Sequence, residues 1–265
     1  MLSMAAPAQS AMIRLSYEHR WLFAGKEIVH DYILHTSADK SMFYNPVAYQ
    51  LDTTSKDEAA RQAYGAMAAA MQASGRGAEV PNRSVSMYIA KSLSDGTKTV
   101  YDDFYDVFAY HDEPYDEMIW NIVSDSVRNV LGYECIMAKS DYHGRHWTAW
   151  FSPEIPMSDG PWKLAGLPGL ILEANEASGT HSFIATGIEH TTDPVPEMIV
   201  PEWYHKEDRK KYLKAKKKFI DNPIAHLFAN IPPGCKVMGS DGTEIKRNDQ
   251  VVTDDNYDLL ETDYH

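Results

Sequence analysis

Hydrophobic and polar positions alternate along much of this chain, and the first clear case begins at Met12. Every second residue from Ile13 to Trp21 is large and mostly apolar, whereas the residues between them are charged or small and polar. Such alternation is typical of a β-strand with one buried face. Further segments with strand character are 27–35, 85–89, 97–101, 104–110, 130–139, 146–151, 169–174 and 181–189. The pattern therefore predicts a protein built mostly from β-strands.

The intervals between these segments are short, and several contain turn-forming dipeptides. Asp95-Gly96, His143-Gly144 and Ser178-Gly179 each separate two predicted strands. Parallel strands need a crossover of a dozen or more residues, so short intervals favour antiparallel neighbours. We expect a mainly β fold: a curved antiparallel sheet, a half-barrel-like meander, with one or two covering helices.

Two segments have helical periodicity instead. Residues 55–74 begin with a capping box, Ser55 to Glu58, and carry Ala and Met at helical spacing. We expect this helix to cover part of the concave face of the sheet. Residues 202–221 combine an apolar stripe with a run of Lys and Arg. We interpret the basic face as a solvated surface, and contact with an anionic membrane surface is the alternative.

Segment 146–173 differs from an ordinary polar loop because it contains three Trp and four Pro. It ends in Gly-Leu-Pro-Gly-Leu-Ile over 166–171, and it follows Gly-Tyr-Glu-Cys over 132–135 and Tyr-His-Gly-Arg over 142–145. Near the N-terminus, residues 41–44 read Ser-Met-Phe-Tyr. These stretches resemble, in order, motifs of the GLPGLI family of exported bacterial proteins, whose biochemical role is not established.

The resemblance covers about residues 12–190 and implies an exported protein. It departs from the family at His143, where we expect Arg, and it does not reach the last 75 residues. Ala6-Pro7-Ala8 fits a signal-peptidase cleavage site, so residues 1–11 are interpreted as a signal-peptide remnant or a disordered N-terminus. We expect a periplasmic or cell-envelope location.

The central segment has physical consequences of its own. Gly166 and Gly169 flank Leu-Pro, so we expect a positive φ or a close backbone approach there. In one interpretation the segment seals the curved sheet, with its three Trp as packing. In the other, Trp147, Trp150 and Trp162 line a groove for an apolar ligand or peptide, and these are our candidate ligand-binding residues.

Composition narrows the possible partners. The net charge of -13 disfavours nucleic acid, because phosphate binding draws on Lys and Arg. No run of 18 apolar residues is present, so we expect no transmembrane segment. We assign 12–233 to a single β-rich domain that includes helix 202–221, and 234–265 to a C-terminal hairpin with a frayed acidic tail. Cys135 and Cys235 are either one disulfide or two free thiols, and both alternatives stay open.

The chain lacks the common catalytic motifs. It contains no nucleophile elbow, HExxH helix, Walker loop or CxxC pair. Four candidate metal-binding histidines are more typical of surface residues than of a site: His143, His146, His181 and His190. Carboxylates flank the central segment at Glu154, Asp159 and Glu173, but a glycosidase pair also requires a fixed separation across a cleft.

We therefore expect no catalytic residues, metal site or cofactor. The function predicted from the sequence is that of an extracytoplasmic, non-enzymatic accessory protein that binds an apolar ligand, a peptide or an envelope partner. The alternative is a hydrolase whose site is assembled from His and carboxylates of distant segments.

Overall fold

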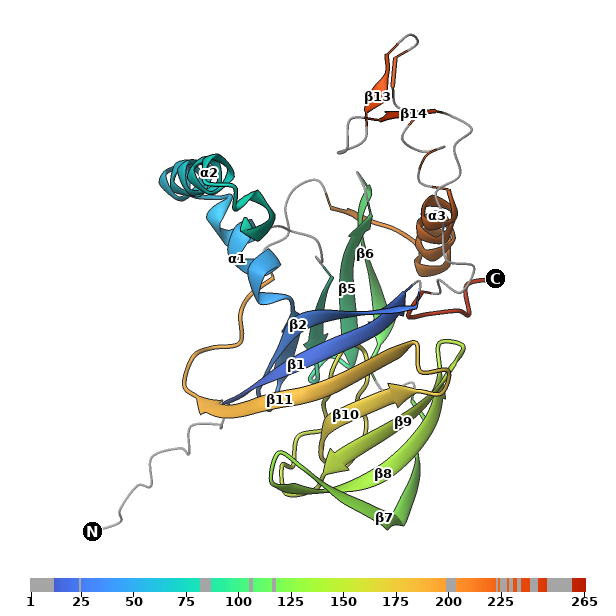
Figure 1. The fold of residues 1–265 in the computed structure, drawn as a ribbon. Coiled ribbons are helices and arrows are strands. Elements are labelled where there is room, and N and C mark those ends of the chain that lie inside the picture. The colour runs from blue at the N-terminus through green and yellow to red at the C-terminus, as the bar shows by residue number, and fades with distance from the viewer. Residues whose placement is uncertain are drawn as a thin grey trace, which may run out of the picture.

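The structure is a computed structural model (Figure 1). It describes residues 12–23, 25–81, 87–104, 107–115, 118–198, 204–222, 224, 228, 231–232, 235–238, 243–246 and 259–265. The expected signal-peptide remnant, 1–11, lies outside the described residues.

Twelve strands of the described chain form one open sheet in the order β12-β6-β5-β4-β3-β2-β1-β11-β10-β9-β8-β7. They are β1 (Met12–Phe23), β2 (Lys26–Thr36), β3 (Lys40–Tyr44), β4 (Tyr88–Ser92), β5 (Thr97–Phe104), β6 (Val107–Pro114), β7 (Asn121–Val130), β8 (Tyr133–Tyr142), β9 (Arg145–Ser152), β10 (Leu170–Glu176), β11 (His181–Thr191) and β12 (His205–Lys206). Neighbours are antiparallel except β12 and β6, which pair in parallel. The predicted mainly β fold is confirmed, and β7 and the two-residue β12 are strands that the sequence did not predict.

The sheet is strongly curved. Lys98 Nζ on β5 donates to the Tyr142 hydroxyl at the end of β8, at 2.7 Å, although seven strands separate β5 from β8 in the sheet order. The two ends of the open sheet therefore bend toward each other (Figure 1). The core lies on this inner face, where Leu15, Phe43 and Phe183 are fully buried.

The inner face is filled by the segment between β9 and β10, residues 153–169, which we call the central loop. Trp162, Leu164 and Leu167 of this loop are at most 1% exposed and belong to the main core cluster. Two loop side chains reach strands at the far end of the sheet: Asp159 pairs with Lys91 on β4, and Lys163 pairs with Glu113 on β6. The central loop therefore ties the two ends of the sheet together.

Two helices follow β3: α1 (Pro46–Thr54) and α2 (Glu58–Ala73). The prediction that the helix within 55–74 covers the concave face is wrong. None of the residues of α2, all of them described, is buried, and the helix stands away from the sheet beyond α1 (Figure 1). The concave face is not open to α2 because the central loop already occupies it.

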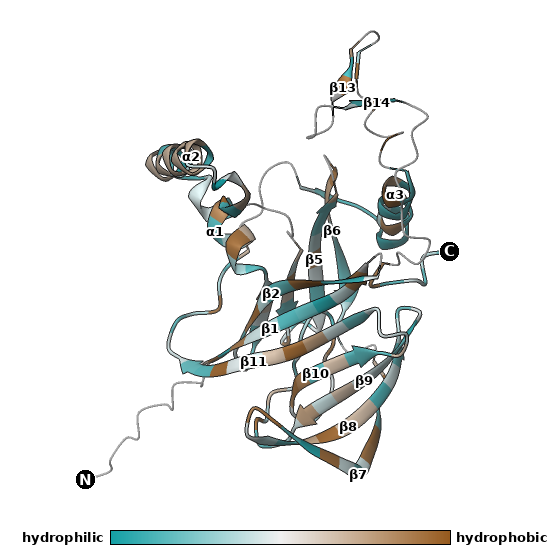
Figure 2. Cartoon of the chain, in the orientation of Figure 1, coloured by the Kyte–Doolittle hydropathy of each residue, from teal (hydrophilic) through white to brown (hydrophobic). Residues whose placement is uncertain are grey.

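The third helix, α3 (Arg209–Asp221), covers part of the sheet. The Asp208 side chain caps it by accepting from Lys211 N at 2.9 Å, so the helix begins later than the predicted position 202. Tyr212 and Leu213 are buried in a cluster with Phe104 and Ala109 of β5 and β6. The rest of α3 is largely hydrophilic (Figure 2). Among the described helices, none combines the length and the hydropathy needed to cross a membrane.

The C-terminal region contains the expected short hairpin, β13 (Val237–Met238) with β14 (Glu244–Ile245). The final residues are packed rather than frayed, so that part of the prediction is wrong. Leu259 and Tyr264 are buried, and Thr262 N donates to His143 O at 2.9 Å in the β8–β9 turn. We call residues 259–265 the C-terminal segment; it lies along this turn and beside α3 (Figure 1).

Candidate functional site

A pocket of about 540 Å³ lies where the central loop meets the start of β1 and the end of β2. We call it the loop pocket. Its apolar lining includes Ile13, Leu93, Ile155 and Met157, and Asp159 is among its polar lining residues. Ligand-binding pockets commonly have volumes of roughly 300–1,000 Å³ and combine apolar walls with a few polar groups. In size and lining, the loop pocket fits that description.

Asp159 is 1% exposed, and its two carboxylate oxygens differ. Oδ1 accepts from Lys91 Nζ at 2.6 Å and from Gly160 N at 2.8 Å. Lys91 Nζ also donates to Gly160 O at 2.7 Å. Oδ2 is equally buried, yet none of the described residues donates a hydrogen bond to it. The Lys91–Asp159 pair is thus compensated in charge but incomplete in hydrogen bonding.

The groups around Asp159 have shifted pKa values. Burial lowers the pKa of Lys91, and the charge of Asp159 opposes this shift. Burial raises the pKa of Tyr17 well above its usual value, and the charge of Asp159 adds to the shift. Burial and then Asp159 raise the pKa of Tyr115 in the same way. Both tyrosines stay neutral and donate hydrogen bonds to backbone carbonyls of the chain around Asp159. The Tyr17 hydroxyl donates to Ile171 O at 2.5 Å, and the Tyr115 hydroxyl donates to Ser158 O.

The sequence of the central loop explains its tight path. Leu170 N donates to Ile155 O and Ile171 N to Asp159 O, each at 3.0 Å, so the loop is bonded to the start of β10. A Cβ on Gly169 would collide with the carbonyl oxygen of Ser152, and Gly166 has a φ of 92°. The expectations of close approach or positive φ at these two glycines are confirmed.

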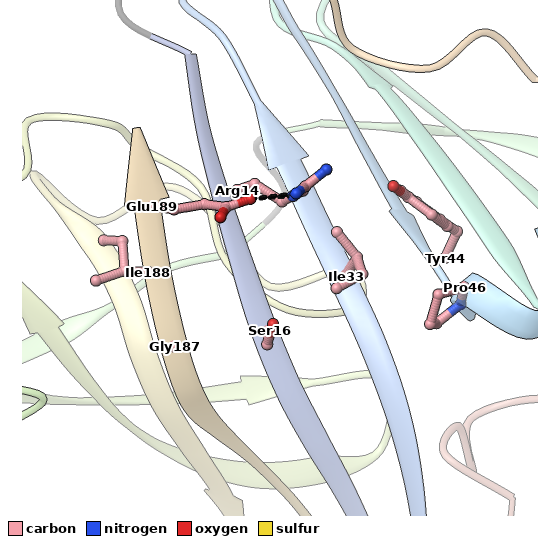
Figure 3. A pocket seen from close by; sticks show the side chains of 8 residues that line it. All are labelled: Arg14, Ser16, Ile33, Tyr44, Pro46, Gly187, Ile188 and Glu189. Carbon is pink, nitrogen blue, oxygen red and sulfur yellow. Dashed lines mark hydrogen bonds and ion pairs between the residues drawn. The ribbon is translucent and has the colours of Figure 1, made fainter. Parts of the chain in front are cut away.

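A second pocket, of about 430 Å³, lies on the opposite face of β1 (Figure 3). Arg14 and Ser16 contribute to it, two residues that alternate with the buried Ile13 and Leu15. Arg14 forms an ion pair with Glu189 on β11, and both side chains are substantially exposed. Because its charged groups already pair with each other in contact with solvent, we consider this pocket a weaker candidate than the loop pocket.

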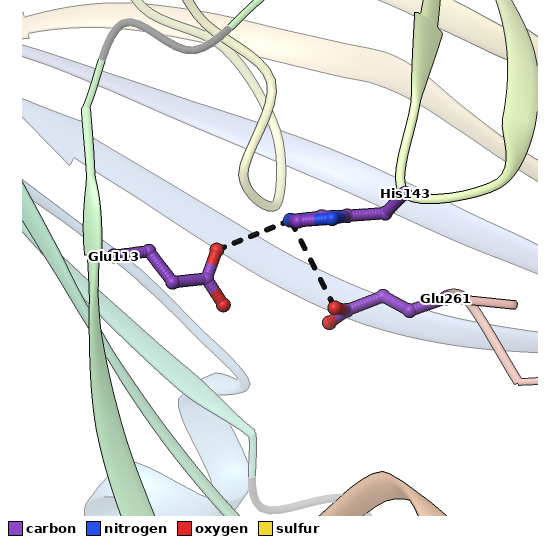
Figure 4. Close-up of side chains that lie close together, drawn as sticks. All are labelled: Glu113, His143 and Glu261. Atoms are coloured by element: carbon purple, nitrogen blue, oxygen red, sulfur yellow. Dashed lines mark hydrogen bonds and ion pairs between the residues drawn. The ribbon is translucent and has the colours of Figure 1, made fainter. Parts of the chain in front are cut away.

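Charged side chains also meet inside the molecule at a place we call the ionic cluster: Glu113, His143, Lys163, Arg209 and Glu261. Lys163 Nζ lies 2.5 Å from Glu113 Oε1 and 2.6 Å from Glu261 Oε1. Glu113 Oε2 lies 3.2 Å from His143 Nε2, and Glu261 Oε2 accepts from Arg209 Nε at 2.5 Å. Figure 4 shows Glu113, His143 and Glu261 converging from β6, the β8–β9 turn and the C-terminal segment.

Three residues of the ionic cluster could in principle hold a metal ion, because ligand atoms of Glu113, His143 and Glu261 lie within 4.8 Å of one another. Lys163 and Arg209, however, already neutralise the two carboxylates. Burial opposes ionisation of Glu113, but hydrogen bonds from His111 and His143 together with the charge of Lys163 hold its pKa well below the usual value. A divalent cation would face two fixed positive charges there, so this donor set fits an internal ion-pair network better than a metal centre.

The three tryptophans predicted to bind a ligand have different environments. Trp147 and Trp162 are at most 1% exposed, and their rings pack against each other with centroids 5.6 Å apart. Trp150 is partly buried, and the Arg128 guanidinium lies 4.1 Å above its ring. None of the three is among the residues of the loop pocket. Ligand binding by these residues stays a prediction, and Trp150 is the one that solvent reaches.

The other candidate residues are dispersed. His146 is exposed beside Asp141, whereas His181 is buried, with its Nδ1 3.2 Å from His19 Nε2. His190 and Glu154 line the loop pocket, and Glu173 pairs with Arg128. Both cysteines, each among the described residues, are free thiols, Cys135 buried and Cys235 exposed. The disulfide alternative is wrong because Cys135 lies within the sheet core while Cys235 lies on the surface.

The sequence-based search missed the buried lysines, although the sequence contains a signal for them. Lys91 lies two residues after the buried Ile89, and Lys98 lies two residues before the buried Val100. A lysine in phase with buried positions of a strand faces the core, where it requires an anionic or polar partner. That alternation is the signal by which Lys91 could have been found.

The fold and the loop pocket define a class: a mainly β protein with an open, curved sheet, filled on its inner face by its own loop next to a ligand-sized pocket. Comparison with known families finds one match. A family described as "Protein of unknown function (Porph_ging)" matches residues 140–173, the region of β9 and the central loop. This short match fits an exported bacterial protein and does not confirm the GLPGLI resemblance. A search of curated protein sequences finds no match.

Comparison with solved structures supports the fold alone. Two structures of PNGF-II, in space groups P21 and C2, are similar to this chain with TM-scores of 0.54 and 0.51, each at 12% identity. The similarity covers 77% and 79% of this chain but 33% of either PNGF-II chain, so the chain spans about a third of their length. A domain from Vibrio parahaemolyticus, described as an outer membrane lipoprotein-sorting protein, has a TM-score of 0.22 at 7% identity and covers 68% of this chain and 86% of its own. A score that low carries no structural argument.

Proposed function

We propose that this chain is a non-enzymatic accessory protein of the bacterial cell envelope that binds an apolar ligand in the loop pocket. The observation that carries the proposal is the pocket itself: about 540 Å³, with Ile13, Leu93, Ile155 and Met157 in its walls. The resemblance to exported bacterial proteins and the short match at 140–173 support an envelope location.

The ionic cluster supports a binding role over a catalytic one. A hydrolase assembled from distant His and carboxylates is the alternative function, and the convergence of Glu113, His143 and Glu261 is the observation that favours it. Yet all four oxygens of the two glutamates already contact Lys163, His143 or Arg209. A general base or nucleophile needs a lone pair within reach of substrate, and here every carboxylate oxygen is held by a cationic or imidazole partner within the protein.

The proposal is tested with an apolar fluorescent probe, N-phenyl-1-naphthylamine, whose emission rises in an apolar site. We expect saturable binding to the full chain and weaker binding in Ala38→Trp, which adds a large ring at a residue that lines the loop pocket. Ser16→Trp is the matched control, because Ser16 lines the second pocket on the opposite face of β1; it should bind the probe normally. Absence of saturable binding, or equal binding by both variants, would contradict the proposal.

A further inference from the structure

Helix α3 carries a positive charge that the proposed binding function does not explain. Of its 13 residues, seven are Lys or Arg and one is acidic, so its net charge is +6 (7 − 1). The net charge of the whole chain is -13, so the residues outside α3 sum to -19 (-13 − 6). Positive charge is therefore concentrated on one helix of an otherwise acidic protein, an asymmetry typical of proteins that contact an anionic partner.

The seven cations of α3 differ in whether they have an acidic partner within the protein. Four of them do: Arg209 pairs with Glu261, Lys211 with Glu207, Lys216 with Asp102 and Lys217 with Asp221. The other three, Lys210, Lys214 and Lys218, form no ion pair with any of the described residues, and all three are exposed. We call these three side chains the lysine row.

The lysine row occupies one side of α3. Its members are four residues apart, and at 3.6 residues per turn such positions follow one another along the same side of a helix, about 6 Å apart. Tyr212 and Leu213 lie on the other side, where they are buried in a cluster with Phe104 and Ala109. Figure 2 shows hydrophilic positions along much of α3. The packing of α3 on the sheet therefore holds the lysine row toward solvent.

The shape of this surface decides which anionic partner fits it. A bound peptide usually lies in a groove or along a sheet edge, and neither the loop pocket nor the second pocket includes a residue of α3. Nucleic acid binding draws on many phosphate contacts, which the charge of -19 on the remaining chain opposes. A membrane surface needs no groove, because its anionic head groups are mobile and each lysine close to them adds to binding.

We infer that the lysine row docks the protein onto a membrane surface that contains anionic phospholipids. The contact is electrostatic and peripheral, because the apolar side of α3, which an interfacial helix would insert into lipid, is already packed against β5 and β6. The helix, with a diameter of about 10–12 Å, separates the lysine row from the acidic sheet by more than the Debye length of about 8 Å at physiological salt. Repulsion between that sheet and the membrane is therefore largely screened.

The experiment measures cosedimentation of the full chain with vesicles of phosphatidylglycerol and phosphatidylcholine in equal parts, and with vesicles of phosphatidylcholine alone. We expect binding to the anionic vesicles at low salt, release at high salt, and no binding to the zwitterionic vesicles. The triple variant Lys210→Gln, Lys214→Gln, Lys218→Gln should bind the anionic vesicles on the order of 100-fold more weakly, at about five-fold for each lysine.

The matched control is a second triple variant, Lys26→Gln, Lys56→Gln, Lys139→Gln. These three lysines are also exposed, but they lie on β2, just after α1 and on β8. The control therefore changes the net charge of the chain by the same amount and leaves α3 intact. We expect it to bind the anionic vesicles as the wild-type chain does, and thermal melts check that both triple variants are folded.

Three results would overturn the inference. They are absence of binding to the anionic vesicles at low salt, equal affinity of the two triple variants for these vesicles, and binding that persists at high salt. Poly-L-glutamate tests the other kind of partner. If the chain binds this polymer through the lysine row and does not bind vesicles, the partner is an acidic polypeptide and the inference is overturned as well.

Discussion

The molecule contains two buried sets of charged side chains. They differ in whether every carboxylate oxygen has a partner. In the ionic cluster, Glu113 and Glu261 each have both oxygens in contact with Lys163, His143 or Arg209. In the Lys91–Asp159 pair, one oxygen of Asp159 has two donors and the other has none among the described residues. The ionic cluster is therefore a complete network of contacts, whereas the Lys91–Asp159 pair leaves one buried oxygen without a donor among the described residues.

The two sets share their scaffold, which makes the comparison informative. Asp159 and Lys163 lie on the same turn-rich stretch of the central loop and reach β4 and β6 respectively. Because the two residues belong to one loop, the difference between the two sets lies in the partners that each side chain meets. The C-terminal segment adds Glu261 to the ionic cluster, and no described segment makes the corresponding contribution to Asp159 Oδ2.

The largest expected effect comes from Gly169→Val, which disturbs both sets at once. A Cβ at this position would collide with the Ser152 carbonyl and lie 3.0 Å from Pro153 Cα, so the central loop could not return to β10 along its present path. We expect loss of a cooperative thermal transition. Gly166→Val is the control: its φ of 92° strains a β-branched residue, but the nearest atom to a Cβ there is 3.7 Å away. It should cost about 1–3 kcal/mol, and equal melting of the two variants would contradict the explanation.

Lys163→Met separates the two sets, because it affects only the ionic cluster. Glu113 and Glu261 would lose their shared buried cation, so we expect the free energy of unfolding to fall by about 3–5 kcal/mol in urea titrations. Probe binding at the loop pocket should survive in the fraction that stays folded. Lys206→Met provides the comparison, since the Lys206–Asp112 pair is exposed and its loss should change stability far less. A similar loss in both variants would mean that burial does not matter here.

Acid should weaken the ionic cluster in a predictable direction. Burial raises the pKa values of Glu261 and Asp263, but Lys163 acting on Glu261 and Arg209 acting on Asp263 leave both below their usual values in the folded chain. The folded state then binds fewer protons than the unfolded state, so this stability is complete above the unfolded glutamate pKa of about 4.3 and is lost as the pH falls below it. Urea titrations from pH 7 to pH 3 measure the loss. Glu261→Gln should show a shallower decline, and an unchanged profile in that variant would remove Glu261 from the explanation.

The smallest effect is expected for Trp150→Ala. The partly buried ring contributes its contact with Arg128, a cation–π pair of about 0.5–1 kcal/mol, in addition to limited packing. Trp147→Ala, in contrast, empties a fully buried site and should cost about 3–5 kcal/mol. Thermal melts compare the two. The same samples check the sequence-based prediction for Trp150: weaker probe binding supports a place in the binding surface, and unchanged binding removes it.

Most strands could be predicted because apolar and polar residues alternate along a strand that has one buried face. The longest strand that was not predicted, β7, breaks its own alternation: Val123 pairs with Met137 and Val127 with Ile136, so the residues between them form a bulge with no partner on β8. Its position at the edge of the sheet leaves Ile122 and Val127 exposed, which removes the contrast between faces. A bulged edge strand has little periodicity to detect.

The helices show a different limit. The sequence contains a local signal for the start of α1: Asn45 caps the helix by accepting from Ala48 N at 2.9 Å, and Pro46 lies in its first turn. The sequence contains no such signal for the packing of α2. Its Ala and Met stripe predicts an apolar helix face, but it carries no information on the central loop, which already fills the concave face. An apolar stripe predicts a helix but does not identify what covers it.

The candidate site combines residues that no local pattern joins. The lysines could have been placed inward from strand phase, but their partners lie 68 positions away for Lys91–Asp159 and 50 positions away for Glu113–Lys163. Such contacts depend on the curvature of the sheet and on the path of the central loop. The incomplete hydrogen bonding of Asp159 follows from that path as well, so it became visible only in three dimensions.

The docked C-terminal segment also sets an order of events during synthesis. Glu261 lies 98 residues after Lys163 (261 − 163), and ribosomes add roughly 5–20 residues per second, so the lysine emerges about 5–20 s before its second carboxylate. During that interval Glu113 is the one glutamate of the pair available to compensate it. A nascent chain that stops before Leu259 therefore lacks both the Glu261 carboxylate beside Lys163 and the Thr262 N–His143 O hydrogen bond at the β8–β9 turn.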